Sequence, residues 1–360
     1  MTAASGDTPF DAILLLSFGG PDGPDDVRPF LENVTRGRGV PPERLDAVAE
    51  HYFHFGGVSP INALNLDIIE RLRAALQTAR IDLPVFFGNR NWHPMVEDTV
   101  AAMYAAGHRH VLVFPTSAWG GYSGCAQYHE DIARALESLA ATTPGLADDP
   151  ITLRKLPHYW DRPEMISACA DAIADARTRL PAAVRDDARL VFTAHSIPVA
   201  ADVAAGPPEL GGHLYSRQVA AASEKAAAAA GFGGHDVVWQ SRSGPPQIPW
   251  LEPDICDHLE SIAADGAAAA IVCPIGFVSD HLEVVWDLDT EAVETAGEVG
   301  IALARAATVG ADDRYIDMIV ALITDQLEGQ TTDAAGLGCT DNGARCAVGC
   351  CASQRPSRPS

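Results

Sequence analysis

The sequence contains few basic residues. Lysine and arginine together number 25, against 48 aspartate and glutamate residues, so the formal net charge is −23 at pH 7. Lys155 and Lys225 are the only lysines. Because nucleic acids and anionic membrane surfaces are bound by basic patches, this balance argues against both as partners. An excess of carboxylates suits a protein that attracts metal cations, although a solvated acidic surface is the more common explanation.

Long apolar segments are absent as well. No stretch reaches the roughly 18 consecutive apolar residues that a transmembrane helix needs. The first residues, MTAASGDTPFDAILLLSFGG, lack the basic segment of a signal peptide. We therefore expect a cytoplasmic protein without a transmembrane segment, in which cysteines stay reduced unless they bind a metal.

Several familiar catalytic motifs are also missing. The sequence has no G-x-x-x-x-G-K-[ST], which argues against a P-loop nucleotide site. The segment GYSGC ends in Cys125 where the hydrolase motif G-x-S-x-G requires a glycine. The segment HLE at 281–283 is not followed by the P-C-x-x-C of nucleobase deaminases.

What the sequence does contain is a regular alternation of apolar runs and amphipathic segments. The apolar runs predict strands within 11–21, 84–90, 110–119, 188–198, 237–250 and from 269 onward. Helices are predicted over 60–80, 94–109, 126–140 and 312–327, the first with Ser59 as its N-cap. Strands that alternate with helices are typical of α/β folds with parallel sheets.

The pattern of the first half returns in the second. Residues 269–292 resemble residues 110–133, because each segment has an apolar run, a proline, a loop of small residues and a helix. We therefore predict an α/β protein with two similar halves, 9–150 and 151–310, followed by a C-terminal helix at 311–328 and a tail at 329–360. Ligands of parallel α/β sheets bind beyond the carboxyl ends of the strands, so the expected site is a cleft between the two facing edges.

Two polar residues follow strands of the second half and are expected at the same edge. They are His195, after LVFTA, and Glu283, after IVCPIGFVSD. A neutral imidazole can accept a proton near neutral pH or bind Fe²⁺, Zn²⁺ or Cu²⁺, and a neighbouring carboxylate would complete an open metal site. A histidine at a strand end is more often a structural residue, and that alternative stays open here.

Three carboxylates continue from this edge. If the chain after Val278 is one α-helix, Glu283, Asp287 and Glu291 lie at i, i+4 and i+8 on one face. Like charges at this spacing repel each other unless cations or protons relieve them. The row could carry metal ions or protons to the inner Glu283, and a solvated helix face is the alternative.

Five segments, in order along the chain, resemble the signature segments of ferrochelatases. They are LLLSFGGP (14–21), HYFHFGGVSPINALN (51–65), FTAHSIP (192–198), WQSRSGPPQIPWLEP (239–253) and CPIGFVSDHLEVVWDLD (273–289). The resemblance extends over residues 10–328. It implies two Rossmann-like, chelatase-type domains that hold a porphyrin in the cleft between them, and an enzyme that inserts Fe²⁺ into that porphyrin.

The resemblance also implies roles for individual residues. His195 and Glu283 match the catalytic metal-site pair of the family, and Asp287 and Glu291 match its acidic helix, the expected path for protons. The positions expected to contact the porphyrin are Phe18, Thr35, His51, Tyr52, Ser59 and Tyr128. Three of these differ from relatives: Phe18 stands where some carry tyrosine, and Thr35 and His51 where relatives carry arginine.

The expected chemistry follows from the substrate. A free-base porphyrin loses two pyrrole protons as the cation enters, and His195 is the best general-base candidate, with Glu283 as its partner. The YSGC loop and the cysteine tail resemble most the bacterial ferrochelatases that metallate coproporphyrin III, which is the substrate we expect. The alternatives are protoporphyrin IX as substrate, a cobalt or nickel chelatase, and a non-catalytic porphyrin or haem carrier. Other enzymes of haem synthesis are expected partners.

The tail contains a second candidate metal site. Four cysteines, Cys339, Cys346, Cys350 and Cys351, lie in GCTDNGARCAVGCC. Four thiolates suit zinc or a [2Fe–2S] cluster, and unliganded thiols are the alternative. Several ferrochelatases carry a [2Fe–2S] cluster on three C-terminal cysteines and one from mid-chain. The resemblance therefore implies Cys125, Cys339, Cys346 and Cys351 as ligands, with Cys350 as the alternative to Cys351.

Overall fold

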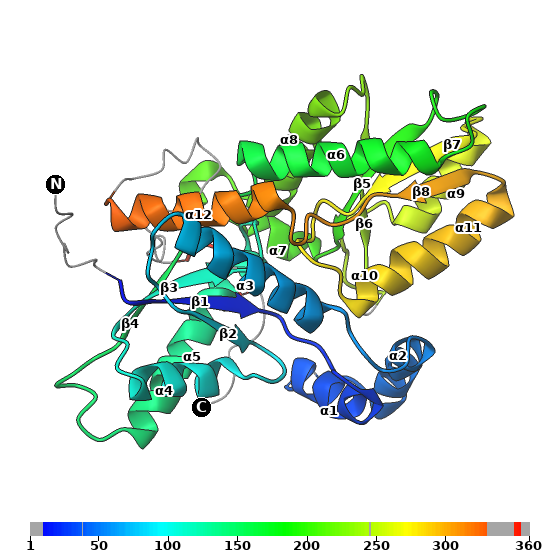
Figure 1. The fold of residues 1–360 in the computed structure, drawn as a ribbon. Helices are drawn as coiled ribbons and strands as arrows, with labels where there is room; N and C mark the ends of the chain where they lie inside the picture. Colours follow the sequence, from blue (N-terminus) through cyan, green and yellow to red (C-terminus); the bar gives the residue numbers. More distant parts are fainter. Residues whose placement is uncertain (1–9, 38, 245, 330–348, 354–360) are drawn as a thin grey trace, which may run out of the picture.

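The computed structural model describes residues 10–37, 39–244, 246–329 and 349–353 (Figure 1). The first half contains β1 (Ala12–Ser17), α1 (Pro24–Val34), α2 (Pro42–His54), α3 (Ile61–Thr78), β2 (Val85–Asn89), α4 (Val96–Ala105), β3 (His110–Pro115), a π-helical turn (Tyr122–Ala126), α5 (Gln127–Thr142) and β4 (Thr152–Lys155). The second half contains α6 (Pro163–Arg179), β5 (Arg189–His195), α7 (Val199–Val203), a 3₁₀ turn (Pro208–Leu210), α8 (Leu214–Ala229), β6 (Asp236–Gln240), α9 (Ile255–Ala264), β7 (Ala269–Cys273), α10 (Leu282–Trp286), a second π-helical turn (Asp287–Glu291), α11 (Ala292–Val299), β8 (Ala302–Arg305) and α12 (Asp313–Leu327).

Two parallel four-stranded sheets with equivalent strand orders form the framework. The first has the order β2-β1-β3-β4 and the second the order β6-β5-β7-β8. Strands β1 and β5 lie inside their sheets and are each paired with a strand on either side. Ile13 of β1, for example, lies opposite Val85 of β2 and Leu112 of β3. The predicted α/β class with two similar halves is therefore confirmed.

Burial on both faces explains why the central strand β1 is an almost continuous apolar run. Every residue of β1, AILLLS, is buried. Ile13 and Leu15 pack in the cluster that contains residues of α3, whereas Leu14 and Leu16 pack in the cluster formed with α4 and α5. A strand covered on both sides has no polar face, so its sequence reads as a continuous apolar run.

The structure differs from the expected boundaries in three places. The boundary expected at residue 150 precedes β4, although Thr152 of β4 pairs with His110 of β3, so the first sheet extends past that residue. Ser59 is not the N-cap of α3, which begins after Pro60 and has no side-chain cap. Helices α1, α2 and α6 to α9 were not among the predicted helices.

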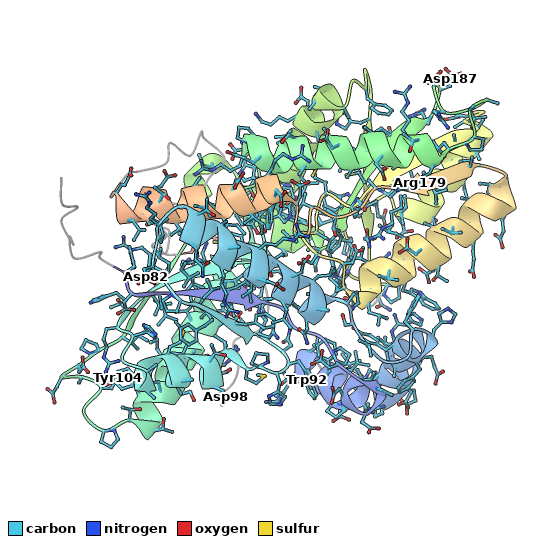
Figure 2. All side chains as sticks on the ribbon, viewed as in Figure 1. Asp82, Trp92, Asp98, Tyr104, Arg179 and Asp187 are labelled. Atoms are coloured by element: carbon cyan, nitrogen blue, oxygen red, sulfur yellow. The ribbon has the colours of Figure 1, made fainter. Side chains whose placement is uncertain are left out.

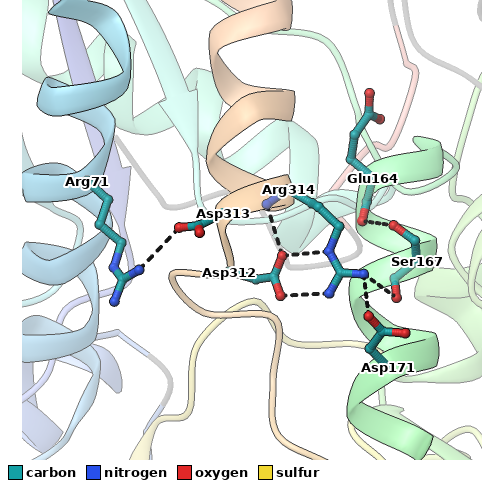
Figure 3. A network of polar contacts seen from close by, with 7 residues as sticks. All are labelled: Arg71, Glu164, Ser167, Asp171, Asp312, Asp313 and Arg314. Carbon is teal, nitrogen blue, oxygen red and sulfur yellow. Dashed lines mark hydrogen bonds and ion pairs between the residues drawn. The ribbon is translucent and has the colours of Figure 1, made fainter. Parts of the chain in front are cut away.

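The last helix joins the two halves. Helix α12 packs against α3 of the first half and α6 of the second, as Figure 1 shows. At its start, Arg314 donates to Asp171 of α6 at 2.7 Å, and Asp313 lies 3.3 Å from Arg71 of α3 (Figure 3). The helix therefore ties the two halves together by packing and by ion pairs at its N-terminal end.

The helical pair α1–α2, inserted between β1 and α3, touches the second half. Phe30 and Leu31 of α1 and Tyr52 of α2 form a buried cluster that also contains Leu282 of α10. Only 1% of Leu282 is exposed. In Figure 1, α2 lies beside the end of α10, and this contact places the first half next to the turn that carries Glu283.

Within the described ranges, none of the helices combines the length and hydrophobicity that crossing a bilayer requires.

Candidate active site

The fold brings His195 and Glu283 together. Strand β5 ends at His195, and its neighbour β7 is followed by the loop 274–281, which leads to Glu283 in the first turn of α10. Nε2 of His195 lies 3.8 Å from Oε2 of Glu283. About 36% of the His195 side chain and 46% of the Glu283 side chain are exposed, so a ligand can reach both groups.

A glycine allows the two segments to approach each other. A side chain at Gly276 would place its Cβ 2.5 Å from Cβ of Ala194, which is closer than atoms can pack. The N–H of Gly276 also donates to the carbonyl of Thr193 at 3.0 Å. The loop after β7 is therefore held against the end of β5, directly beside His195.

A hydrogen bond determines which ring nitrogen of His195 carries the hydrogen and which has a lone pair. Nδ1 lies 2.5 Å from the carbonyl oxygen of Ser196, and since a carbonyl only accepts, Nδ1 carries the hydrogen. In the neutral ring, Nε2 is then the proton acceptor or metal ligand. The hydroxyl of Tyr215 donates to the His195 carbonyl at 2.9 Å, which holds the backbone at this point.

The environment of His195 favours its protonated form. Burial acts to lower the pKa of the imidazole, but the hydrogen bond and the charge of Glu283 act in the opposite direction. The net result is a pKa above the ordinary value of 6.5. A proton taken up by His195 is therefore stabilised by the adjacent carboxylate.

Asp287 is a second titratable group of unusual character. Its Oδ2 accepts hydrogen bonds from Ser241 and, at 3.1 Å, from Nε2 of Gln240. Burial outweighs the hydrogen bond from Ser241 and, together with the charge of Glu283, raises the pKa of Asp287 to about 7. This carboxyl can therefore gain or lose a proton near neutral pH.

The expected continuous α-helix beyond Val278 is not what the structure contains. Helix α10 spans only Leu282–Trp286, and a π-helical turn follows at Asp287–Glu291. Hydrogen bonds in a π-helix run from i to i+5, so Glu291 is not one α-helical turn above Asp287. Instead, Nε1 of Trp286 donates to Oε1 of Glu291, five residues later, at 2.9 Å.

Three of the residues expected at the porphyrin lie near the α1–α2 pair. Phe18, which follows β1, is 36% exposed and meets the ring edge of Phe30. Tyr52 is buried against the same Phe30, with ring centroids 5.9 Å apart. His51 is stacked on Trp286 of the second half.

The other three expected positions have partners within the first half. Oγ1 of Thr35 donates to the carbonyl of Leu31 at the end of α1, at 2.7 Å. Ser59 is buried, and its N–H donates to the carbonyl of Pro21. Tyr128 is also buried, with the guanidinium of Arg90 4.5 Å from the centre of its ring. Of the six positions, Phe18 is thus the most exposed.

A pocket of about 490 Å³ lies next to one of these positions, since the N–H of its lining residue Asn91 donates to the Phe18 carbonyl at 3.1 Å. It is formed between α1 and the segment 91–95, and its lining includes Asn33, Arg36, Asn91 and Trp92. Trp92 lies beside α1, as Figure 2 shows, and its ring meets the edge of Phe30. None of the predicted site residues lines this pocket.

Three of the cysteines come together where the described part of the tail returns to the body of the protein. Cys125 and Cys351 are buried, and Sγ of Cys350 lies 3.7 Å from Sγ of Cys351. Sγ of Cys351 accepts the N–H of Gly206 at 3.2 Å. Cys339 and Cys346, the other two predicted ligands, lie outside the described residues.

Among the residues that the structure describes, no group of three or more His, Cys, Asp or Glu side chains has the geometry to hold a metal ion. The two side chains His195 and Glu283 could therefore hold a cation only as a weak, open pair.

The sequence analysis missed four residues that support the site. Gln240 and Ser241 hold Asp287, Tyr215 holds the backbone of His195, and Trp286 holds Glu291. A signal existed for two of them, because Gln240 is the polar last residue of the otherwise apolar end of β6, paired with His195, and Ser241 follows it. Tyr215 and Trp286 lie on helices, where nothing in the sequence distinguishes them from packing residues.

Comparisons with known proteins identify the family of this chain. The ferrochelatase family model matches residues 10–327. The coproporphyrin III ferrochelatases of Nocardia farcinica, Mycobacteroides abscessus and Mycolicibacterium smegmatis are 62%, 57% and 55% identical to this chain, over 96%, 96% and 95% of it and 97%, 99% and 99% of their own lengths.

Solved structures show the same fold at much lower identity. SirB from Bacillus subtilis with Fe³⁺ superimposes with a TM-score of 0.52 and 13% identity, covering 89% of this chain and 98% of that one. This likeness concerns the fold alone, whereas the family match and the relatives that are more than half identical concern the sequence. On these grounds the chain belongs to the ferrochelatase family.

Proposed function

We propose that this protein inserts Fe²⁺ into coproporphyrin III, giving the iron complex coprohaem in haem biosynthesis. The observation that carries the proposal is the accessible Nε2 of His195, 3.8 Å from the Glu283 carboxylate at the carboxyl edge of the second sheet. The substrate is supported by relatives named coproporphyrin III ferrochelatase, which are 55–62% identical over nearly their whole length.

The reaction exchanges two pyrrole protons for one Fe²⁺. Each N–H bond breaks as an iron–nitrogen bond forms, and the two released protons need acceptors close to the ring. Nε2 of His195 accepts a proton, and the charge of Glu283 stabilises the resulting imidazolium, which is the direction in which the pKa of His195 is shifted. Imidazole and carboxylate are also ligands for Fe²⁺, and only two of them hold the ion weakly enough for it to leave for the ring.

Asp287 is the proposed next acceptor along the path to solvent. Its pKa of about 7 matches the pH at which protons must be taken up and released. The charge of Glu283 contributes to raising this pKa, so the two carboxyls influence each other's protonation. Glu291, held by Trp286, is the proposed outer member of the path.

The proposed porphyrin site lies between the edges of the two sheets. Phe18, the most exposed of the candidate contacts, offers an aromatic surface on the first half. Ser59, Tyr128, Tyr52, His51 and Thr35 remain candidates for the surrounding contacts. Across from them, His195 and Glu283 would meet the ring centre.

Steady-state metallation tests the proposal. Anaerobic enzyme with Fe²⁺ should turn over many equivalents of coproporphyrin III, with a kcat/KM roughly tenfold or more above that for protoporphyrin IX, because two vinyl groups cannot replace two hydrogen-bonding carboxylates. A preference for protoporphyrin IX would assign the protohaem reaction instead. Stoichiometric binding without turnover would make the protein a carrier.

We also propose that Cys125, Cys339, Cys346 and Cys351 hold a [2Fe–2S] cluster. The described thiols fit this role in part. The hydrogen bond from the Cys350 thiol lowers the pKa of Cys351, while burial acts the other way. The backbone N–H groups of Gly206 and Gly121 add to the lowering, and such donors stabilise cluster-bound thiolates. Cys351 is therefore favoured over Cys350 as the ligand. A bound cluster would supply a covalent link from the tail to the first half.

Metal analysis tests the cysteine site. Purified protein should be red-brown and contain about two iron and two acid-labile sulfide per chain, and Cys125→Ser should bleach it. Colourless protein with one zinc per chain would indicate a zinc site instead of the cluster. Active protein that contains no metal would show that the cysteines are unliganded thiols.

The proposed location is the cytoplasm. Cys169, Cys256 and Cys273 are thiols outside any disulfide, as a reducing compartment maintains them.

A further inference from the structure

We propose that Trp286 and His51 are positioning residues for Glu283, because their contact docks the α1–α2 pair of the first half onto the turn that carries this carboxylate. The inference rests on the proposed function, since it concerns the geometry of the metal-insertion site. It assigns to His51 a role across the interface between the halves.

The contact between the two residues is close and well aligned. The His51 and Trp286 rings are stacked, with centroids 3.9 Å apart and planes at 10°. His54 and Phe55 meet the same indole edge-on, at 5.6 and 6.3 Å. The C-terminal end of α2 therefore surrounds the Trp286 ring on more than one side.

Glu283 lies between two docking points. Leu282 is buried in the cluster of α1 and α2, and Trp286, four residues later, stacks on His51. Residues at i and i+4 share one face of a helix, so both contacts face the first half. Both belong to α10, which is only five residues long. Such a short helix has little stability of its own, so packing determines its orientation.

The indole also connects to the π-helical turn. Its Nε1 donates to Glu291 at 2.9 Å while its face stacks on His51. Burial lowers the pKa of His51, although Glu291 and Glu283 act to raise it. The lowered pKa favours the neutral imidazole, which can stack on the indole without the cost of removing a charged group from water.

The consequence concerns the 3.8 Å separation between His195 and Glu283. Both groups belong to the second half, and Val284 anchors α10 in the core of that half, yet Leu282 and Trp286 of the same helix are held by the first half. A displacement of about 1 Å in a catalytic group can reduce a rate roughly a hundredfold. Opening of the α1–α2 pair would therefore disassemble the metal site, and its docking would complete it.

Kinetics of three variants and a control test this. Trp286→Ala and His51→Ala should each lower kcat for iron insertion roughly ten- to a hundredfold, and the double variant should lose little more, because both remove one contact. Trp286→Ala should leave the dissociation constant of metal-free coproporphyrin, measured by fluorescence, close to that of the wild type. Val293→Ala, at a half-exposed position on α11, is the matched control and should behave as wild type.

The conservative variant Trp286→Phe keeps an aromatic ring against His51 and should restore most of the kcat lost in Trp286→Ala. The inference would be overturned if kcat were unchanged in Trp286→Ala, or if the losses of the two single variants multiplied in the double variant. A loss of porphyrin affinity without a loss of kcat would also overturn it. If Trp286→Ala does not fold, failure of Trp286→Phe to outperform His51→Ala overturns it as well. A wild-type protein that inserts no iron would instead overturn the proposed function.

Discussion

Replacing Asp287 by asparagine should make the protein more stable at alkaline pH while making it a poorer enzyme. Asp287 accepts hydrogen bonds from Ser241 and Gln240, and an amide oxygen can accept the same two bonds. Asparagine also resembles the neutral carboxyl in shape. The substitution therefore removes the negative charge and leaves the local packing intact.

The magnitude follows from the shifted pKa. The unfolded chain ionises Asp287 near the ordinary pKa of 3.8, whereas the native protein keeps the proton up to a pKa of about 7. Between these values the native state binds one more proton than the unfolded state, so its stability falls as pH rises. The slope is about 1.4 kcal/mol per pH unit, and the whole interval gives an upper limit of about 4 kcal/mol, reached above pH 7.

Urea denaturation at several pH values measures this effect. At pH 4 the free energies of unfolding of wild type and Asp287→Asn should be nearly equal, because both side chains are neutral in the native state. At pH 8 the variant should be more stable by up to about 4 kcal/mol. A stability difference that does not change between pH 4 and pH 8 would refute the assignment of a raised pKa to Asp287.

Three further predictions concern the pair and the joint between the halves. His195→Ala and Glu283→Gln should each reduce kcat roughly 10²–10⁴-fold while coproporphyrin still binds, as metallation assays and fluorescence titration can establish; near wild-type turnover in either would exclude the pair as the catalytic groups. Glu283 raises the pKa of His195, and His195 must be unprotonated to act as the base, so kcat/KM of the wild type should decrease as the pH falls below the pKa of His195, which lies above 6.5. In Glu283→Gln this pKa is lower, so the decrease in the residual kcat/KM should begin at a lower pH. The same pH profile in both proteins would contradict this. Arg314→Ala should lower the free energy of unfolding by about 1–2 kcal/mol. The control Arg71→Ala, which loses only exposed ion pairs, with Asp67 and Asp313, should lower it by less than about 1 kcal/mol; equal losses in urea denaturation would remove the special role of Arg314 at the joint.

The sequence was sufficient to predict the framework and the central pair. The apolar run AILLL of β1 predicted a strand covered on both faces, and that is its environment. His195 and Glu283 each follow an apolar strand of the same half, so the rule that parallel strands end at one edge was enough to place them together. Their 3.8 Å separation confirms that expectation.

The parts that could not be predicted depend on contacts between distant segments. Nothing in DLDTE shows that this segment forms a π-helical turn, because π- and α-helices differ by one residue in the spacing of their hydrogen bonds. The stack of Trp286 on His51 depends on how the two halves meet, which no periodicity describes. Cys350 and Cys351 are adjacent in sequence, and their sulfurs are distinguished only in the fold, where Cys351 is buried and accepts the N–H of Gly206.

The two π-helical turns show how one architecture provides two different sites. Both lie between the third strand of a half and the helix that packs beside it: Tyr122–Ala126 after β3, and Asp287–Glu291 after β7. A π-helical turn adds a residue to a helical turn, which redirects side chains without disturbing the sheet. In the first half the turn contains Cys125, which lies close enough to Cys351 to influence its pKa; in the second it begins with Asp287, which reaches Gln240 and Ser241. The extra residue is tolerated because it lies beyond the carboxyl edge, where the strands end and the packing of the sheet no longer constrains the chain. The residues that each turn carries, and not the strand order or the position that the halves share, therefore determine which chemistry each turn can present.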